Sequence, residues 1–109
     1  MQSPLQITFR DIEPSDFIQS TIRERAARLE RFNGQITRCH VVVGMPHRHH
    51  RKGQHFSVRI DITTPGGTLT VARDPHEDTA REDFNVVIRD AFDAATRRLE
   101  DDTRRRATR

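Results

Sequence analysis

The segment that most constrains the fold of this chain is an apolar stripe near its C-terminal end. Between Phe84 and Leu99, apolar residues recur at steps of three and four, namely Phe84, Ile88, Ala91, Ala95 and Leu99, with Val87 and Phe92 beside them. This spacing predicts an amphipathic helix whose stripe must cover another apolar surface. The outward side of this helix is expected to carry Arg89, Arg97 and Arg98, interleaved with Asp90, Asp93 and Glu100.

Most of the remaining apolar residues lie in runs that alternate with polar ones, which is typical of strands with one buried face. Three such runs are Leu5 to Phe9, Ile36 to Met45 and Phe56 to Thr63. A turn at residues 65–67 then leads into a fourth, short strand at Thr68 to Ala72. We therefore expect the last three strands to form a meander, with a loop over residues 47–54 between the first two of them.

A second helix is predicted from Asp16 to Phe32. Ser15 is a good N-cap, Asn33 and Gly34 are typical helix ends, and the stripe consists of Ile18, Ile22, Ala26 and Leu29. The resulting order is strand, helix, three strands, helix. It predicts an α+β fold, a two-layer sandwich in which two helices cover one face of a four-stranded sheet and the other face stays open.

The length of 109 residues indicates one domain, which we expect to span residues 1–103, followed by a basic flexible tail at 104–109. Hydrophobic residues make up 33% and charged residues 32%, so the core is lean and the surface heavily ionised. A single cysteine, Cys39, excludes an internal disulfide, and there is neither a signal-peptide run nor a membrane-spanning segment. These features predict a cytoplasmic protein without a membrane partner.

Arginine dominates the basic residues. Of the 19 lysines and arginines only Lys52 is a lysine, and the net charge is +3. The planar guanidinium group suits phosphate and base edges, which favours a nucleic-acid partner. The same usage would also arise in a GC-rich genome without functional meaning, and acidic neighbours such as Glu24, Asp90 and Asp93 are equally compatible with a solvated, salt-bridged helix surface.

Enzyme and metal functions find little support in the sequence. Cys39 is expected to face the core as a small hydrophobe, and no glycine-rich phosphate loop or serine elbow is present. The histidines around the predicted loop, at 47, 49, 50 and 55, match no zinc module, and residues 74–78 are better explained as turn and helix-entry charges. We expect no enzyme activity, cofactor or metal. Protonation of the histidine-rich loop near pH 6.5 is an open hypothesis for pH-sensitive phosphate binding.

Several segments together resemble one known family. The opening LQITFRDIEPSDFIQSTIRERAARLERF, the turn and strand PGGTLTVARDP, and the helix EDFNVVIRDAFDAATRRLED are similar to the ribosome hibernation promoting factor and ribosome-associated inhibitor family, also called sigma-54 modulation proteins. The resemblance covers about Leu5 to Glu100. It implies a fold akin to double-stranded-RNA-binding domains. It also implies binding to small-subunit ribosomal RNA in the decoding channel, where such proteins block messenger and transfer RNA during stress.

The resemblance rests on Arg28-Leu29, on Phe84 with Ile88, and on Arg97 with Leu99. Two departures are Arg89, where the family usually has an acidic residue, and the acidic run at 100–102. The chain is similar to the short members, which lack the C-terminal dimerisation domain, so we expect a monomer or a weak homodimer.

The predicted RNA contacts are arginines on the outer helix faces and basic residues of the loop. They are Arg28, Arg89 and Arg97 first, supported by Arg23, Arg31, Arg48, Arg51 and Lys52. Without an aromatic platform, since Phe9 and Phe56 are in the inward register, recognition is expected to rely on shape and phosphates. The alternative function is a protein-interaction module that modulates the transcription machinery. No small-molecule substrate is expected.

Overall fold

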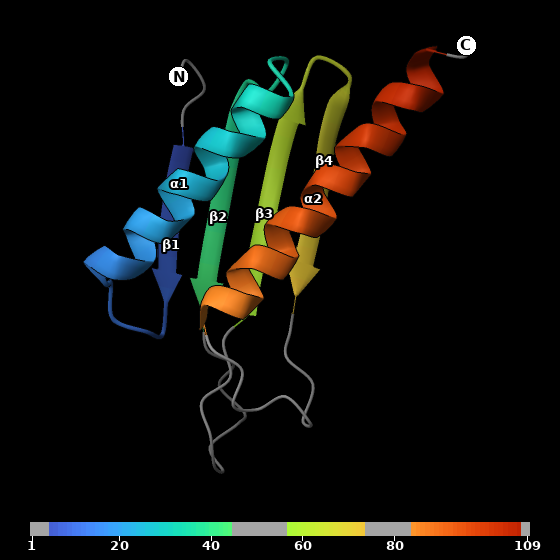
Figure 1. Cartoon of the computed structure of the whole chain (residues 1–109). Coiled ribbons are helices and arrows are strands. Elements are labelled where there is room, and N and C mark those ends of the chain that lie inside the picture. Colours follow the sequence, from blue (N-terminus) through green and yellow to red (C-terminus); the bar gives the residue numbers. More distant parts are fainter. Residues whose placement is uncertain (1–4, 45–56, 74–83, 108–109) are drawn as a thin grey trace.

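The structure is a computed structural model and describes residues 5–44, 57–73 and 84–107 (Figure 1). Its elements follow the predicted order: β1 (Leu5–Arg10), α1 (Asp16–Phe32), β2 (Arg38–Gly44), β3 (Ser57–Thr64), β4 (Gly67–Arg73) and α2 (Phe84–Ala107). Both helices lie on the same side of the sheet, and none of the described elements covers the other side. The predicted two-layer α+β sandwich is confirmed.

The sheet has the order β1-β2-β3-β4. β1 runs parallel to β2, while β2, β3 and β4 pair antiparallel, as expected of a meander. A parallel neighbour requires a crossover connection, and α1 provides it. The register places Ile7, Val41, Ile60 and Val71 side by side across the four strands. Because side chains alternate along a strand, these residues define the face that the helices cover.

The core lies between this face and the two helical stripes. Ile22, Val41, Ile60 and Ile88 are fully buried at its centre. Leu99, near the end of the predicted stripe, is also buried. Each large aliphatic side chain that is removed from water contributes about 1.5 to 3 kcal/mol, so the helical stripes hold the two layers together.

The ends of α1 follow the capping signals in the sequence. The Ser15 side chain accepts a hydrogen bond from the Ile18 N–H at 3.3 Å, and the Asn33 N–H donates to the Leu29 carbonyl at 2.9 Å. At the β3–β4 turn, Gly67 has φ +136°, a conformation that side chains with a Cβ rarely adopt.

The C-terminal boundary differs from the prediction. α2 continues to Ala107, so residues 104–107 are helical rather than part of a flexible tail. Arg104 pairs with Asp101 at 2.7 Å and Arg105 with Asp102 at 3.8 Å, each three residues apart on the helix. Pairs at this spacing stabilise a helix end, and the acidic run at 100–102 supplies their carboxylates.

Candidate nucleic-acid interface

The first group of predicted contacts lies on α1. Arg23, Arg28 and Arg31 are exposed and point away from the buried stripe. The Arg23 guanidinium donates to Gln19 Oε1 at 3.2 Å, and Arg28 lies 3.5 Å from a carboxylate oxygen of Glu24. An exposed pair of this kind adds little stability. The Glu24 carboxylate nevertheless lowers the positive charge that a polyanion would meet at Arg28.

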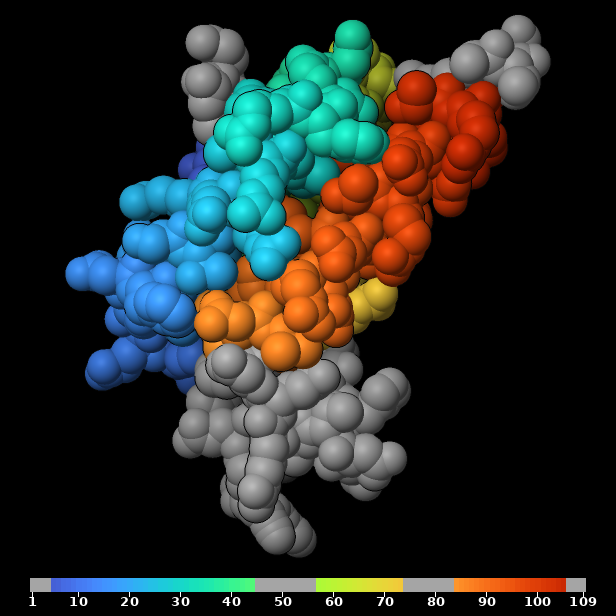
Figure 2. All heavy atoms as spheres, viewed as in Figure 1, coloured from blue at the N-terminus to red at the C-terminus, as the bar shows by residue number. Residues whose placement is uncertain are grey.

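The second group lies on α2, which runs beside α1 on the helical side of the molecule (Figure 2). Arg89 and Arg97 are exposed as predicted. Arg89 lies 3.4 Å from Asp90, and Asp93 and Glu100 are also exposed on this helix. The two arginines therefore share their surface with carboxylates, which is also what a solvated, salt-bridged helix surface would show.

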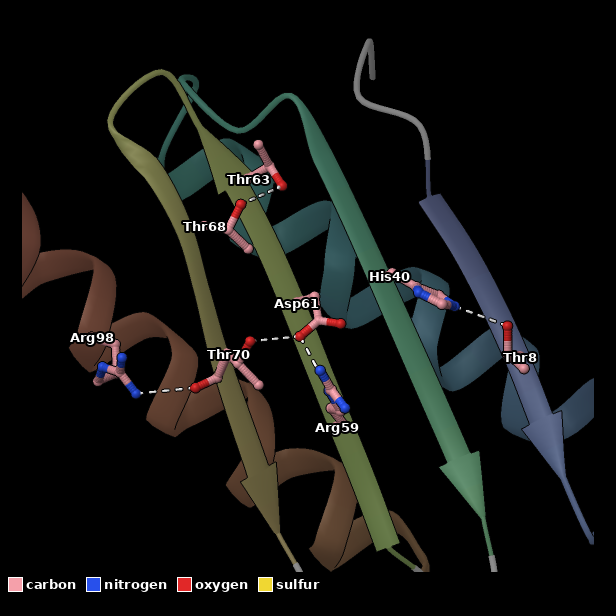
Figure 3. A network of polar contacts seen from close by, with 8 residues as sticks. All are labelled: Thr8, His40, Arg59, Asp61, Thr63, Thr68, Thr70 and Arg98. Atoms are coloured by element: carbon pink, nitrogen blue, oxygen red, sulfur yellow. Dashed lines mark hydrogen bonds and ion pairs between the residues drawn. The ribbon is translucent and has the colours of Figure 1, made fainter.

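Arg98 behaves differently from Arg97, although the sequence placed both on the outward side of the helix. Its guanidinium donates to the backbone carbonyl of Thr70 on β4 at 3.1 Å (Figure 3). The helical period places this position about 100° around the helix axis from Arg97, on the side nearer the sheet. Arg98 is therefore an anchor between α2 and β4.

The remaining predicted contacts fall outside the described residues. Arg48, Arg51 and Lys52 belong to the predicted loop, as do the histidines at 47, 49, 50 and 55, and the charged segment 74–78 also lies outside. Their roles stay predictions.

Each helix carries only one more arginine than carboxylates. α1 has Arg23, Arg25, Arg28 and Arg31 against Asp16, Glu24 and Glu30, and α2 shows a similar balance over its length. The outer helix faces thus carry many cationic groups but little net charge. Binding of a polyanion to them depends on individual guanidinium contacts more than on a strong overall field.

The open face of the sheet has a less balanced charge. Its outward positions include Arg10, Arg38 and Arg59, and the only carboxylate on them in the described strands is that of Asp61. Neither Arg10 nor Arg38 forms an ion pair with any residue that the structure describes. This face therefore presents cations with few neutralising partners.

A polar network joins the strands on this face (Figure 3). Asp61 accepts hydrogen bonds from the Thr70 hydroxyl at 2.7 Å and from Arg59 Nε at 3.2 Å. Burial raises the pKa of Asp61, but the hydrogen bonds from Thr70 and Arg59 and the charges of Arg59 and His40 outweigh it, so the pKa lies below its usual value. The Asp61 carboxylate is thus ionised at neutral pH. On the neighbouring strand, His40 Nε2 lies 2.9 Å from the Thr8 hydroxyl, and this contact links β2 to β1.

The same side chains border a shallow hollow of about 340 Å³. Its lining consists of Arg38, His40, Arg59, Asp61, Thr63, Thr68 and Thr70. Hydroxyl and guanidinium groups make this hollow mainly polar, and such groups are suited to phosphate or sugar oxygens.

The sequence matches a known protein family over most of its length. A family model described as "Sigma 54 modulation protein / S30EA ribosomal protein" matches residues 5–107. The chain belongs to this family. The resemblance inferred from the sequence is therefore confirmed, over a longer range than the motifs covered. A search of curated proteins found no match.

Two solved structures share the family fold. The N-terminal domain of Protein Y from Thermus thermophilus superposes with a TM-score of 0.66 at 21% identity, covering 91% of this chain and 96% of that one. A ribosomal subunit interface protein from Coxiella burnetii gives a TM-score of 0.73 at 12% identity, with the same coverage of 91% and 96%. At these identities the likeness establishes the fold.

The arginines of the open sheet face were missed as candidate contacts by the sequence reasoning. Alternation within the runs 36–45 and 56–63 puts Arg38 and Arg59 at outward positions, but only the strand register shows that both border one hollow. Pairing aligns Arg38 with Thr63 and Arg59 with Val42, so the two arginines flank the level of Asp61. The available signal was a basic residue at an outward position in each of three strands.

The aromatic residues agree in part with the prediction. Phe9 packs partly buried against the core, as expected, and Phe56 lies outside the described residues. Phe17 and Phe32, however, are 63% and 49% exposed on α1. They are 15 residues apart in the helix, or about 22 Å, which is too far for a platform that stacks neighbouring bases.

Groups for other chemistry are scarce in the described parts of the chain. Burial raises the pKa of the Cys39 thiol to about 11, with smaller effects from Asp61 and Glu30, so it stays protonated and unreactive at neutral pH. No group of three or more potential metal ligands occurs among residues 5–44, 57–73 and 84–107. No helix within these ranges is long and apolar enough to cross a bilayer.

Proposed function

We propose that this protein is a ribosome-associated translation inhibitor that binds small-subunit ribosomal RNA in the decoding channel and blocks messenger and transfer RNA. The observation that carries the proposal is the match of the Sigma 54 modulation / S30EA family over residues 5–107. The Coxiella burnetii protein, named a ribosomal subunit interface protein, has the same fold and nearly the same length.

Inhibition would work by occupancy. A domain that fills the path of messenger and transfer RNA needs contacts to ribosomal RNA and no catalytic group. Arg28, Arg89 and Arg97 are the proposed phosphate contacts, with Arg23 and Arg31 in support. The guanidinium groups of these residues are exposed on two adjacent helices, and each can donate to phosphate oxygens. Arg48, Arg51 and Lys52 of the predicted loop complete the proposed set.

The test is co-sedimentation with small ribosomal subunits, combined with inhibition of cell-free translation. In an Arg28→Glu/Arg97→Glu variant we expect both binding and inhibition to be lost, because two phosphate contacts become repulsive. The matched control is Arg28→Lys/Arg97→Lys, which keeps the charge and should retain most binding. Co-sedimentation of the glutamate variant at the wild-type level would reject the helical face as the contact surface.

The family description also names sigma-54 modulation, which supports the alternative of a protein-interaction module for the transcription machinery. Sucrose-gradient profiles of stationary-phase lysate with and without RNase separate the two functions. Migration with small subunits that is lost after RNase treatment supports the ribosomal role. Migration with the transcription machinery that resists RNase supports the alternative.

A further inference from the structure

We propose that the open face of the sheet is a second phosphate-binding surface, which holds a strand of RNA backbone across the hollow between Arg38 and Arg59. This inference deepens the proposed function and rests on it. The predicted contacts among the described residues all lie on the helices, whereas this surface lies on the opposite side of the two-layer domain.

Charge complementarity favours a polyanion on this face. Arg10 and Arg38 have no ion-pair partner among the described residues, and the side chain of Arg59 is 59% exposed although Asp61 holds its Nε. The remaining N–H groups of Arg59 are thus free to donate to phosphate oxygens. A polyanion on this face would lie near three arginines and one carboxylate. The excess of positive over negative groups is therefore two, compared with one on each helix.

The shape and chemistry of the hollow favour the backbone over the bases. Its lining combines guanidinium groups with the hydroxyls of Thr63 and Thr68, which hydrogen-bond to each other at 3.2 Å, so that one of the two keeps its proton to donate to a phosphate or ribose oxygen. No Phe, Tyr or Trp side chain lies on the outward positions of the described strands, and the ring of His40 is held by its hydrogen bond to Thr8, so this face has no platform for stacking successive bases. Binding should therefore be independent of sequence and sensitive to salt.

Strand geometry sets the span of this surface. Arg38 and Arg59 are separated by four residues along the register, which corresponds to about 13 Å at the usual rise of a strand. His40 and Asp61 occupy the level between them, and the hydrogen bond to Thr8 fixes the His40 ring toward β1. A backbone segment that runs along β2 and β3 can contact both arginines while it passes the hollow.

A protein with binding surfaces on both sides can contact two separate segments of RNA. RNA held on the sheet cannot be the segment that lies along α1 and α2, because the two layers of the domain separate them. The protein would therefore lie between two segments of RNA and contact both. Loss of either face should weaken binding independently, since substitutions that share no partners have additive free energies.

The experiment measures binding of the full chain to a 20-nucleotide oligouridine by fluorescence anisotropy at several salt concentrations, and to small subunits by co-sedimentation. For Arg38→Gln/Arg59→Gln we expect about tenfold weaker oligouridine binding and a salt slope that is smaller by about 1.4, that is, about 0.7 for each lost phosphate contact on a single strand. Arg38→Lys/Arg59→Lys is the matched control and should keep the slope. Thermal melts establish that each variant is folded.

A second variant tests the surface through a gain. Asp61→Asn removes the carboxylate and can still accept the hydrogen bond from Thr70. We expect about threefold tighter oligouridine binding, because one nearby repulsive charge is removed. A variant that failed to fold would not bind oligouridine more tightly, so this increase in affinity cannot arise from unfolding. Unchanged affinity and slope in both the glutamine double variant and Asp61→Asn would overturn the proposal, as would binding of an acidic protein in place of RNA on this face.

The outcomes also distinguish this inference from the proposed function. If the Arg28→Glu/Arg97→Glu variant loses small subunits while the sheet variants bind normally, the function stands and the second surface is rejected. If the wild-type protein fails to bind small subunits but the sheet variants alter oligouridine binding as expected, the phosphate surface stands and the ribosomal function is rejected.

Discussion

β3 turns Ile60 and Ile62 toward the helices and Arg59 and Asp61 toward solvent, so a single strand contributes to two surfaces of different character. The covered face is apolar and largely buried, whereas the open face is polar and carries more arginine than carboxylate. Stability and the proposed ligand binding thus depend on alternate residues of the same strands. Substitutions can therefore test one property with little effect on the other.

The largest expected effect is on the covered face. Ile60→Ala removes a side chain that is 0% exposed, and we expect a loss of about 2 to 5 kcal/mol in the free energy of unfolding. Its neighbour on the open face is the matched control, because Arg59→Ala removes only an exposed ion pair worth less than about 1 kcal/mol. Urea denaturation measures both. Equal losses at the two positions would break the distinction between the faces.

A smaller loss of stability is expected on α2, where two adjacent arginines differ in their contacts. Arg98→Ala removes the hydrogen bond to the Thr70 carbonyl, and we expect a loss of about 0.5 to 1 kcal/mol. Arg97→Ala makes the same chemical change one residue earlier at an exposed position, with an expected change within about 0.5 kcal/mol. Thermal denaturation of both variants, together with their RNA affinity, measures the difference. Arg98 should affect stability more, and Arg97 should affect binding more.

The smallest expected effect is a pH dependence on the open face. The pKa of Asp61 is lower in the folded protein than its usual value of 3.8, so its ionised form stabilises the fold above that pH. This contribution is lost as the pH falls below 3.8 through the folded pKa. Asp61→Asn should therefore show a shallower loss of unfolding free energy in acid, measured by urea titrations from pH 5 to pH 2. Identical acid profiles for variant and wild type would contradict the network around Asp61.

Much of the fold was accessible from the sequence because local signals agreed with one another. The stripe that contains Ile88 and Leu99, the Ser15 cap and the alternation in β3 each predicted the element that the structure shows. The end of α2 was predicted too early, because residues 104–109 were expected to be a flexible terminal tail, whereas pairs such as Arg104 with Asp101 extend the helix.

The candidate interface was less accessible, since it depends on which side chains meet across the fold. The sequence placed Arg28, Arg89 and Arg97 on exposed helix faces, which the structure shows, but it did not separate Arg97 from the anchoring Arg98. It also placed Arg38 outward without indicating that the register brings it to the same hollow as residues of β3 and β4. Periodicity defines faces, and pairing between strands defines neighbours.

The hydrogen bond between Arg98 and Thr70 also affects the tendency of the protein to aggregate at high concentration. β4 is the last strand of the sheet, and its outer backbone would otherwise offer a template on which a strand of another chain could assemble. A guanidinium group that already occupies one of its carbonyls must be displaced before such pairing can spread. The side chain that joins helix to sheet thus also hinders edge-to-edge aggregation along this border.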